Sequence, residues 1–171
     1  MFDAAGQIEF VFEQYAELIF HVAYQYTGQK AQAEDITQDV FLKLLRTAAQ
    51  FTSQEHLKAW LIRVAVNQSK DYLRSGAVRN TQPLTKEIAA RHTAAAEEEA
   101  FLFDDTDRYV MEKLACLDPK YRIIIYLYYY ENYNSTQIAD LMDISRNTVN
   151  TWLRRARKRL RMEMEDCADW R

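Results

Sequence analysis

The chain has 171 residues, enough for one ordinary domain or two small ones. Its 22 Lys and Arg residues are outnumbered by 25 Asp and Glu residues, which gives a formal charge of −3. This charge excludes a uniformly basic nucleic-acid-binding protein, so any binding of nucleic acid would depend on local positive patches. With three glycines, two prolines and no convincing alternation of apolar and polar residues, the sequence predicts an all-α protein.

The cysteines and the N-terminus bear on the cellular compartment. Cys116 and Cys167 are far apart and belong to no CxxC or His-rich pattern, which indicates reduced thiols without a disulfide framework or a metal site. The first residues lack the arrangement of a cleavable signal, and no apolar run approaches membrane-spanning length. We therefore expect a cytoplasmic protein that needs no metal or other cofactor.

The first fifty residues predict two helices. Apolar residues at helical spacing form one stripe: Ile8, Phe12, Tyr15, Leu18, Ile19, Val22 and Tyr26. Gly28 is placed to end this helix in the left-handed conformation. A second helix is expected over about 31–50, and its inward residues are Ala33, Ile36, Val40, Leu44 and Ala48.

The outer side of the second predicted helix is polar and mostly acidic. Its residues are Glu34, Asp35, Gln38, Asp39 and Lys43. A solvated acidic face is the preferred interpretation, and a docking face for a protein partner is an alternative. A metal site of the helical-bundle kind would need repeated Glu-x-x-His pairs, and none of the three histidines has a Glu three residues before it.

Residues 51–56 interrupt the helical pattern and are expected to form a loop. A third helix is predicted over about 57–74. Arg63, Asn67, Lys70 and Arg74 share one face of it at steps of four, three and four residues. Three cations around one amide, next to a loop, are typical of a nucleic-acid surface, although a solvated face has the same appearance.

From Ser75 to about Asp107 the periodicity fades and the composition becomes acidic, which predicts a flexible interdomain linker with a helical stretch around 85–100. The expected divisions are 1–75, 76–107 and 108–171.

In the last part, Asp118 as cap and Pro119 as first helical residue open a helix. Its run at 123–130, IIIYLYYY, has high strand propensity, but we predict a helix because the cap signal is strong and a lone strand would have no partner.

The end of the chain predicts a helix-turn-helix. Asn134 and Gln137 have the spacing of a capping box, and Asp143 stands in the turn, where Asp tolerates left-handed backbone better than most residues. Ser145 is an N-cap for a basic helix. Val149, Leu153, Ala156 and Leu160 form its apolar stripe. In such a motif the second helix enters the major groove of DNA.

The outer face of this basic helix carries cations, amides and a hydroxyl that can bind phosphates and base edges, although a solvated basic helix is the alternative. The candidate DNA-binding residues are Arg146, Asn147, Asn150, Thr151, Arg154, Arg155 and Lys158. Arg159 and Arg161 lie farther along and are expected at phosphates. Trp152, beside the apolar stripe, is expected to contribute mainly packing.

Three stretches together resemble the extracytoplasmic function (ECF) sigma factors, part of the sigma-70 superfamily of bacterial RNA polymerase. Residues 33–44 (AEDITQDVFLKL) are similar to conserved region 2.2, residues 51–75 to regions 2.3 and 2.4, and residues 117–160 to region 4. The resemblance implies two small helical domains, sigma region 2 and sigma region 4 with its helix-turn-helix, joined by a flexible linker. Asp143 stands where the family has a turn glycine, and Asn150 and Trp152 replace its usual basic residues, so no promoter sequence is predicted.

The resemblance also implies a function. A sigma factor binds core RNA polymerase, recognises the minus-ten and minus-thirty-five promoter elements and promotes transcription initiation, and it is not an enzyme and takes no small-molecule substrate. Asp35, Gln38 and Asp39 would bind the polymerase, and the basic helix would contact the minus-thirty-five element. The residues implied at the minus-ten element are Phe51, Thr52, Ser53, Gln54, Arg63, Asn67, Lys70 and Arg74. An anti-sigma factor, often anchored in the membrane, would control the protein and hold it there.

Two other functions remain open from the residues alone. A conventional transcription regulator with a helical sensor domain would use the same helix-turn-helix without polymerase, but it would leave the acidic helix and the basic face around Asn67 without a role. An enzyme would need a convergent set of His, Cys or carboxylate residues, and the sequence offers none.

Overall fold

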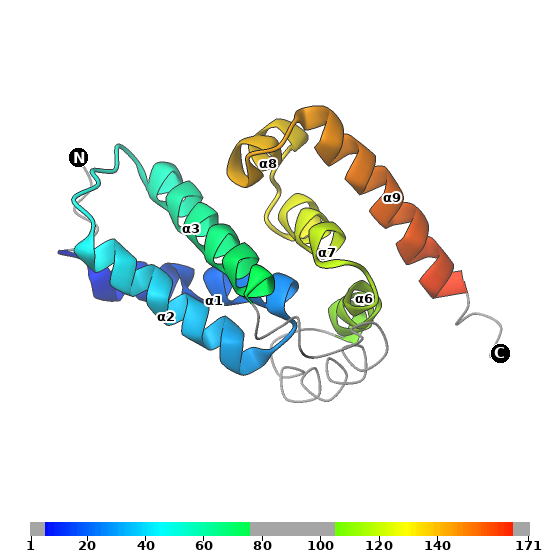
Figure 1. Cartoon of the computed structure of the whole chain (residues 1–171), viewed down its shortest axis with the longest axis horizontal. Coiled ribbons are helices and arrows are strands. Elements are labelled where there is room, and N and C mark those ends of the chain that lie inside the picture. Colours follow the sequence, from blue (N-terminus) through cyan, green and yellow to red (C-terminus); the bar gives the residue numbers. More distant parts are fainter. Residues whose placement is uncertain (1–5, 76–104, 166–171) are drawn as a thin grey trace. The chain divides into compact units, whose positions relative to one another are not determined.

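The computed structural model describes residues 6–75 and 105–165, and the chain divides into two compact units, Met1–Val78 and Arg79–Arg171 (Figure 1). Every regular element in the two described ranges is helical, which confirms the predicted all-α class. Among these residues no helix is both long and apolar enough to span a membrane. The expected helical stretch around 85–100, with most of the predicted linker, lies outside the described residues.

The first unit consists of three helices, α1 (Ile8–Thr27), α2 (Lys30–Arg46) and α3 (Gln54–Arg74), each of which packs on the other two. Side chains from all three close one core, which includes Ile19, Val40 and Leu61. As predicted, Gly28 ends α1 in the left-handed region, with a φ of 62°. Its N–H donates to the carbonyl oxygen of Tyr24 at 2.9 Å, which satisfies one carbonyl of the last helical turn.

Two predictions about the first unit were wrong. Phe12 is 45% exposed, because the neighbouring Val11 occupies the inward position instead. Helix α2 ends at Arg46, so Ala48 is exposed and not part of an inward stripe. The early end has a tertiary cause: the chain leaves the helix at an extended Thr47, and Phe51 then enters the core with 1% of its surface exposed.

The loop before α3 is also shorter than predicted, because the helix begins at Gln54 and not near Leu57. The hydroxyl oxygen of Ser53 accepts the backbone N–H of His56 at 3.1 Å, and this N-cap satisfies a donor that the helix itself cannot pair. Residues 54–56 therefore belong to the first turn of α3.

The second unit begins with α6 (Asp105–Ala115) and α7 (Pro119–Ile125), which continues into η1 (Tyr126–Tyr130); α8 (Ser135–Met142) and α9 (Arg146–Glu165) complete it. Helix α9 packs on α6, α7 and α8. The strand-like run at 123–130 is helical, as predicted, and residues 123–127 are buried. Its last five residues form a π-helix, which was not predicted; the N–H of Glu131 donates to the carbonyl oxygen of Tyr126 at 3.3 Å.

The predicted capping signals of the helix-turn-helix are confirmed. The Asn134 side chain accepts the N–H of Gln137 at 3.0 Å, and the Gln137 side chain accepts the N–H of Asn134 at 2.9 Å. Asp143 has a φ of 54°, the left-handed value that the tight turn requires. The Ser145 hydroxyl accepts the N–H of Thr148 at 3.0 Å and starts α9. These local bonds fix the angle at which α9 leaves the turn.

Candidate functional sites

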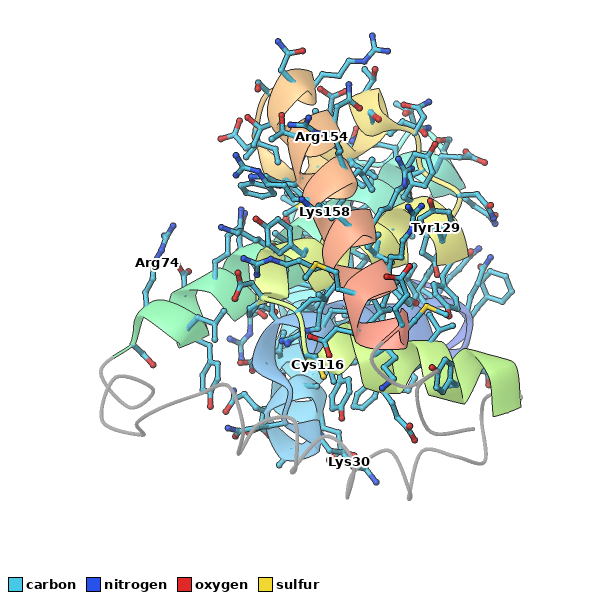
Figure 2. All side chains as sticks on the ribbon, turned by 90° about the vertical axis from the view of Figure 1, so that its right-hand side faces the viewer. Lys30, Arg74, Cys116, Tyr129, Arg154 and Lys158 are labelled. Atoms are coloured by element: carbon cyan, nitrogen blue, oxygen red, sulfur yellow. The ribbon has the colours of Figure 1, made fainter. Side chains whose placement is uncertain are left out.

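Helix α9 separates an inward apolar stripe from an outward polar face. Val149, Leu153 and Ala156 are buried, and Leu160 is half-buried. Successive residues turn by about 100°, so Arg154 and Lys158 project away from this stripe, one turn apart (Figure 2). The candidate DNA-binding residues are all exposed apart from the half-buried Thr151: Arg146, Asn147, Asn150, Thr151, Arg154, Arg155 and Lys158.

The cations of α9 fall into two groups by their partners. Arg157 donates a hydrogen bond from Nε to the hydroxyl oxygen of Tyr129 at 2.7 Å. The Nη1 atom of Arg159 lies 3.3 Å from Oδ2 of the Asp118 carboxylate. Arg154, Lys158 and the other outward cations have no such partner within residues 6–75 and 105–165. The side chains of Arg159 and Asp118 are 54% and 51% exposed, and exposed ion pairs contribute only about 0–1 kcal/mol. This pair therefore does not exclude the phosphate contact predicted for Arg159, which stays a prediction. The charges of the outward group remain available to an external ligand.

Trp152 is half-buried and lies beneath the ammonium group of Lys120. The Lys120 Nζ is 5.6 Å from the centre of the Trp152 ring and 5.0 Å from that of Tyr121. A cation over an indole face stabilises a surface contact by about 0.5–1 kcal/mol. This arrangement suits the packing role predicted for Trp152, which stays a prediction.

On the first unit, Asp35, Gln38 and Asp39 are exposed and lie on one side of α2. Gln38 also borders a groove of about 500 Å³ between α1 and α2. The remaining groove residues are mainly apolar: Ile8, Glu9, Phe12, Glu13, Phe41, Leu42 and Leu45. Leu42 and Leu45 are 45% and 47% exposed. An apolar groove beside acidic groups is typical of a surface that binds another protein.

These groove residues were not predicted as functional. The signal was present, because Leu42 and Leu45 fall outside the inward stripe of α2 yet are large and apolar. Only the structure shows that Phe12, from another helix, lines the same groove.

The segment before α3 is built around a buried Phe51. Its ring centre lies 5.5 Å from that of His56 and 5.6 Å from that of Trp60, and both pairs are edge-on. Phe51, which was predicted among the minus-ten residues, is therefore buried beneath the segment and not at its surface, whereas Thr52 and Gln54 are exposed and Ser53 is half-buried.

His56 belongs to the segment 51–56 that was predicted as a loop, but the sequence predicted no role for its side chain, because a lone histidine carries no spacing signal. Its Nδ1 accepts the backbone N–H of Thr52 at 3.4 Å and lies 3.3 Å from the Thr52 hydroxyl. These contacts close the segment across the first turn of α3 and hold Thr52 in place.

The predicted basic face of α3 is present at the surface. Arg63, Asn67 and Arg74 are exposed, and Lys70 is half-buried. Arg74 Nη1 lies 3.9 Å from the Asp71 carboxylate, but both side chains are strongly exposed. Exposed ion pairs contribute about 0–1 kcal/mol, so this pair does not prevent Arg74 from binding a phosphate.

Tyr15, Tyr26 and Glu55 have pKa values shifted from their usual ones, and these three residues do not belong to the basic faces of α3 and α9. Burial raises the pKa of the Tyr26 hydroxyl. Burial and, to a smaller extent, the charge of Glu55 raise the pKa of Tyr15. The backbone N–H of Glu55 and the Ser53 hydroxyl hold the pKa of the exposed Glu55 carboxyl below its usual range, so this group stays charged at the start of α3.

Within the described parts of the chain, no three His, Cys, Asp or Glu side chains gather as metal ligands would. Cys116 is exposed and belongs to no disulfide among the described residues, and its Sγ lies 3.9 Å from the carbonyl oxygen of Glu112. Cys167 lies outside the described residues.

Each of the two units matches a family of known proteins. Residues 11–79 match the family Sigma-70 region 2, and residues 107–160 match the family Sigma-70, region 4. The chain is 26% identical over 160 residues to the ECF RNA polymerase sigma factor SigW of Bacillus subtilis, covering 89% of this chain and 86% of that protein. It is 26% identical over 163 residues to the ECF RNA polymerase sigma factor SigL of Mycobacterium tuberculosis, covering 95% and 91% of the two chains.

A solved structure has a similar fold. It is the sigma factor RpoE in complex with the anti-sigma factor NepR from Bartonella quintana. The match has a TM-score of 0.64 and 17% sequence identity, and it covers 93% of this chain and 97% of that one.

Proposed function

The chain belongs to the ECF sigma factors of the sigma-70 family, and from this premise we propose that it binds core RNA polymerase, recognises the minus-ten and minus-thirty-five promoter elements and promotes transcription initiation. One observation carries the proposal: a region 2 match and a region 4 match follow each other in the chain, one in each helical unit. A conventional regulator with a sensor domain would account only for the second match.

At the minus-thirty-five element, α9 lies in the major groove. Arg146, Asn147 and Asn150 are near the end that follows the turn, and Thr151, Arg154, Arg155 and Lys158 continue the same outward face. Arg and Asn can each form two hydrogen bonds with one base edge, so this mixture supports base recognition together with phosphate binding.

At the minus-ten element, the segment 51–54 and the basic face of α3 hold the melted strand. Pulling a base out of the stack costs a few kcal/mol, which the pocket that receives the base must offset. The bonds of Ser53 and His56 support this role, because they order the segment before DNA arrives. Phe51 acts as the floor beneath it, and Arg63, Asn67, Lys70 and Arg74 bind the adjoining backbone.

The polymerase binds on α2, at Asp35, Gln38 and Asp39 and over the groove next to them. The exposed Leu42 and Leu45 support this assignment, because apolar area removed from water stabilises a complex by about 25 cal/mol per Å². The acidic groups add electrostatic complementarity to a basic partner surface.

The relatives are sigma factors, which regulate transcription, and we infer that the chain itself catalyses no reaction and needs no cofactor. The chemistry then belongs to the polymerase, and the protein acts in the cytoplasm. An anti-sigma factor controls it by covering its binding faces, and a membrane-anchored inhibitor would hold it at the membrane. The similar fold of RpoE, whose structure contains the anti-sigma factor NepR, supports this part of the proposal.

Transcription in vitro tests the function directly. Core polymerase is supplied with a genomic DNA library, with this protein added or omitted, and the transcript starts are sequenced. We expect a set of starts that depend on the protein and share two upstream elements. An identical set of starts in both reactions would contradict the proposal.

A further inference from the structure

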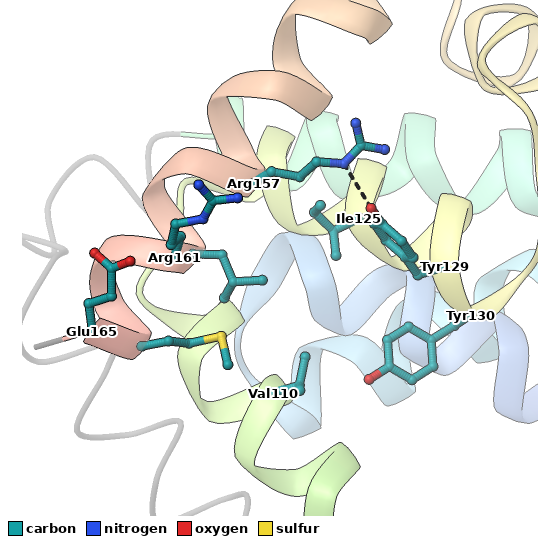
Figure 3. A pocket seen from close by; sticks show the side chains of 9 residues that line it. Val110, Ile125, Tyr129, Tyr130, Arg157, Arg161 and Glu165 are labelled. Atoms are coloured by element: carbon teal, nitrogen blue, oxygen red, sulfur yellow. Dashed lines mark hydrogen bonds between the residues drawn. The ribbon is translucent and has the colours of Figure 1, made fainter. Parts of the chain in front are cut away.

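Arg157 is exposed, but it makes more contacts with side chains of its own unit than the other α9 cations do among the described residues. Its Nε donates to the Tyr129 hydroxyl at 2.7 Å, as the dashed line in Figure 3 shows. Its guanidinium carbon lies 5.3 Å from the ring centre of Tyr128 and 5.6 Å from that of Tyr129. One hydrogen bond and two cation–ring contacts thus join α9 to η1.

The π-helix explains how two consecutive tyrosines reach one arginine. A π-turn closes with an i to i+5 bond and holds one more residue than an α-turn, which narrows the angle between successive side chains. The rings of Tyr128 and Tyr129 are edge-on to each other, with centres 5.0 Å apart. This places both rings against the Arg157 guanidinium.

A second cation holds the opposite flank of α9. Arg157 follows Leu153 by four residues and Arg159 follows Ala156 by three, so at about 100° per residue the two arginines lie on either side of the apolar stripe. Arg159 lies 3.3 Å from the Asp118 carboxylate, and its guanidinium carbon is 5.2 Å from the ring centre of Tyr121. The helix is therefore held from both sides, against η1 and against the start of α7.

We propose that Arg157 is a positioning residue for promoter recognition: through Tyr128 and Tyr129 it fixes the rotation of α9 about its own axis and contributes no phosphate contact. An α-helix with side chains is about 10–12 Å wide, so a rotation of about 20° moves the ends of the outward side chains by about 2 Å. Hydrogen-bond distances vary by only about 0.5 Å, so such a rotation breaks base contacts made by Arg154 or Asn150. The assignment rests on the proposed function of α9, which is to recognise the minus-thirty-five element.

The test uses the full chain assembled with core polymerase. The variants are Arg157→Ala, Arg157→Lys, which keeps the charge but loses the planar fork, and Tyr129→Phe, which keeps the ring but loses the hydroxyl. Arg161→Ala is the matched control, because Arg161 is an exposed cation of the same helix that is expected at a phosphate. Two quantities are measured below the melting temperature of every variant: the salt dependence of promoter binding, and the base preference selected from a library of upstream elements.

For Arg157→Ala we expect an unchanged salt slope and about tenfold lower discrimination between the best and mismatched upstream elements, comparable to one or two lost base contacts. Arg157→Lys should lose discrimination similarly, and Tyr129→Phe should lose part of it. Arg161→Ala should lower the salt slope by about one and leave the base preference intact.

Three results overturn the assignment. A salt slope lowered by about one in Arg157→Ala, with recovery in Arg157→Lys, would make Arg157 a phosphate ligand. A lower melting temperature with unchanged base preference would make it a stability residue only. If Tyr129→Phe and Arg157→Lys each discriminate between upstream elements as well as the wild type does, the contact between Arg157 and the tyrosines does not position α9. If the wild-type holoenzyme selects no upstream element, the proposed function itself fails and this assignment fails with it, whereas an intact wild-type preference isolates the failure to Arg157.

Discussion

At the scale of single residues, the angle of a side chain around α9 decides what it can bind. Arg154 and Lys158 project outward, whereas Arg157 and Arg159 turn back to aromatic and acidic partners of the same unit. A count of positive charges in the sequence would treat all of them as equal. Their contributions to DNA binding should therefore differ in kind as well as in size.

Arg154 and Arg161 should separate base recognition from phosphate binding. Replacing Arg154 by Ala should weaken promoter binding by about 1–3 kcal/mol and relax preference at one upstream position, because a side chain that holds a base edge is lost. Replacing Arg161 should weaken all promoters alike and lower the salt slope by about one. Binding assays on a promoter library at several salt concentrations measure both effects. Uniform weakening by the Arg154 variant would assign that residue to the backbone.

Trp152 should act on stability before it acts on specificity. Trp152→Ala removes a half-buried ring and its contact with Lys120, and a loss of about 1–3 kcal/mol in the free energy of unfolding is expected for the second unit. Differential scanning calorimetry of the full chain measures the loss, and Trp152→Phe, which keeps a ring, should recover much of it. An unchanged melting transition with an altered upstream motif would show that Trp152 contacts DNA.

At the scale of helices, the features set by residues near one another in the sequence were predictable. Gly28, the Asn134–Gln137 capping box, Asp143 and Ser145 each act within a few residues, and the structure has all of them as expected. The helical state of residues 123–130 also followed from a local signal, the Asp118–Pro119 start, against a strand propensity that needs a partner strand to be realised.

Features set by distant partners were not predictable. The end of α2 depends on Phe51 entering a core made by other helices, and the groove beside Gln38 depends on Phe12 from α1. The Arg157 to Tyr129 bond joins residues 28 positions apart, and the π-turn that brings Tyr128 and Tyr129 to it has no periodicity of its own. For the candidate sites, the sequence could identify which face is polar but not which cations are already paired.

The outward face of α2 should be required for binding the polymerase. Reversing Asp35 and Asp39 to Lys should reduce copurification with core polymerase, because like charges would then oppose the basic partner surface. Helical content measured by circular dichroism should stay unchanged, since both residues are exposed. Undiminished copurification of the double variant would remove the assignment.

At the scale of the whole molecule, the matches to sigma-70 regions 2 and 4 and to ECF relatives confirm the family that three stretches of sequence indicated. The division of labour between the two units has a consequence for inhibition. An inhibitor that covers only one unit would leave the proposed binding face of the other exposed, so we expect an inhibitor to cover both.

Hydrogen exchange should therefore detect an inhibitor in both units. In a complex with a candidate anti-sigma factor, amides in 31–74 and in 117–160 should be protected, because both ranges contain proposed binding faces. Mass spectrometry of the free and bound protein measures the protection segment by segment. Protection in only one of the two ranges, or in neither, would contradict this mode of control.

Each unit is also made of consecutive residues, Met1–Val78 and Arg79–Arg171, and this order has a consequence during synthesis. Ribosomes add about 5–20 residues per second, whereas small helical folds form in microseconds to milliseconds. The first unit should thus be folded on the nascent chain seconds before the second is complete. During that interval the face of α2 proposed to bind the polymerase is already available, so we expect that a partner can bind the protein while its translation is still in progress.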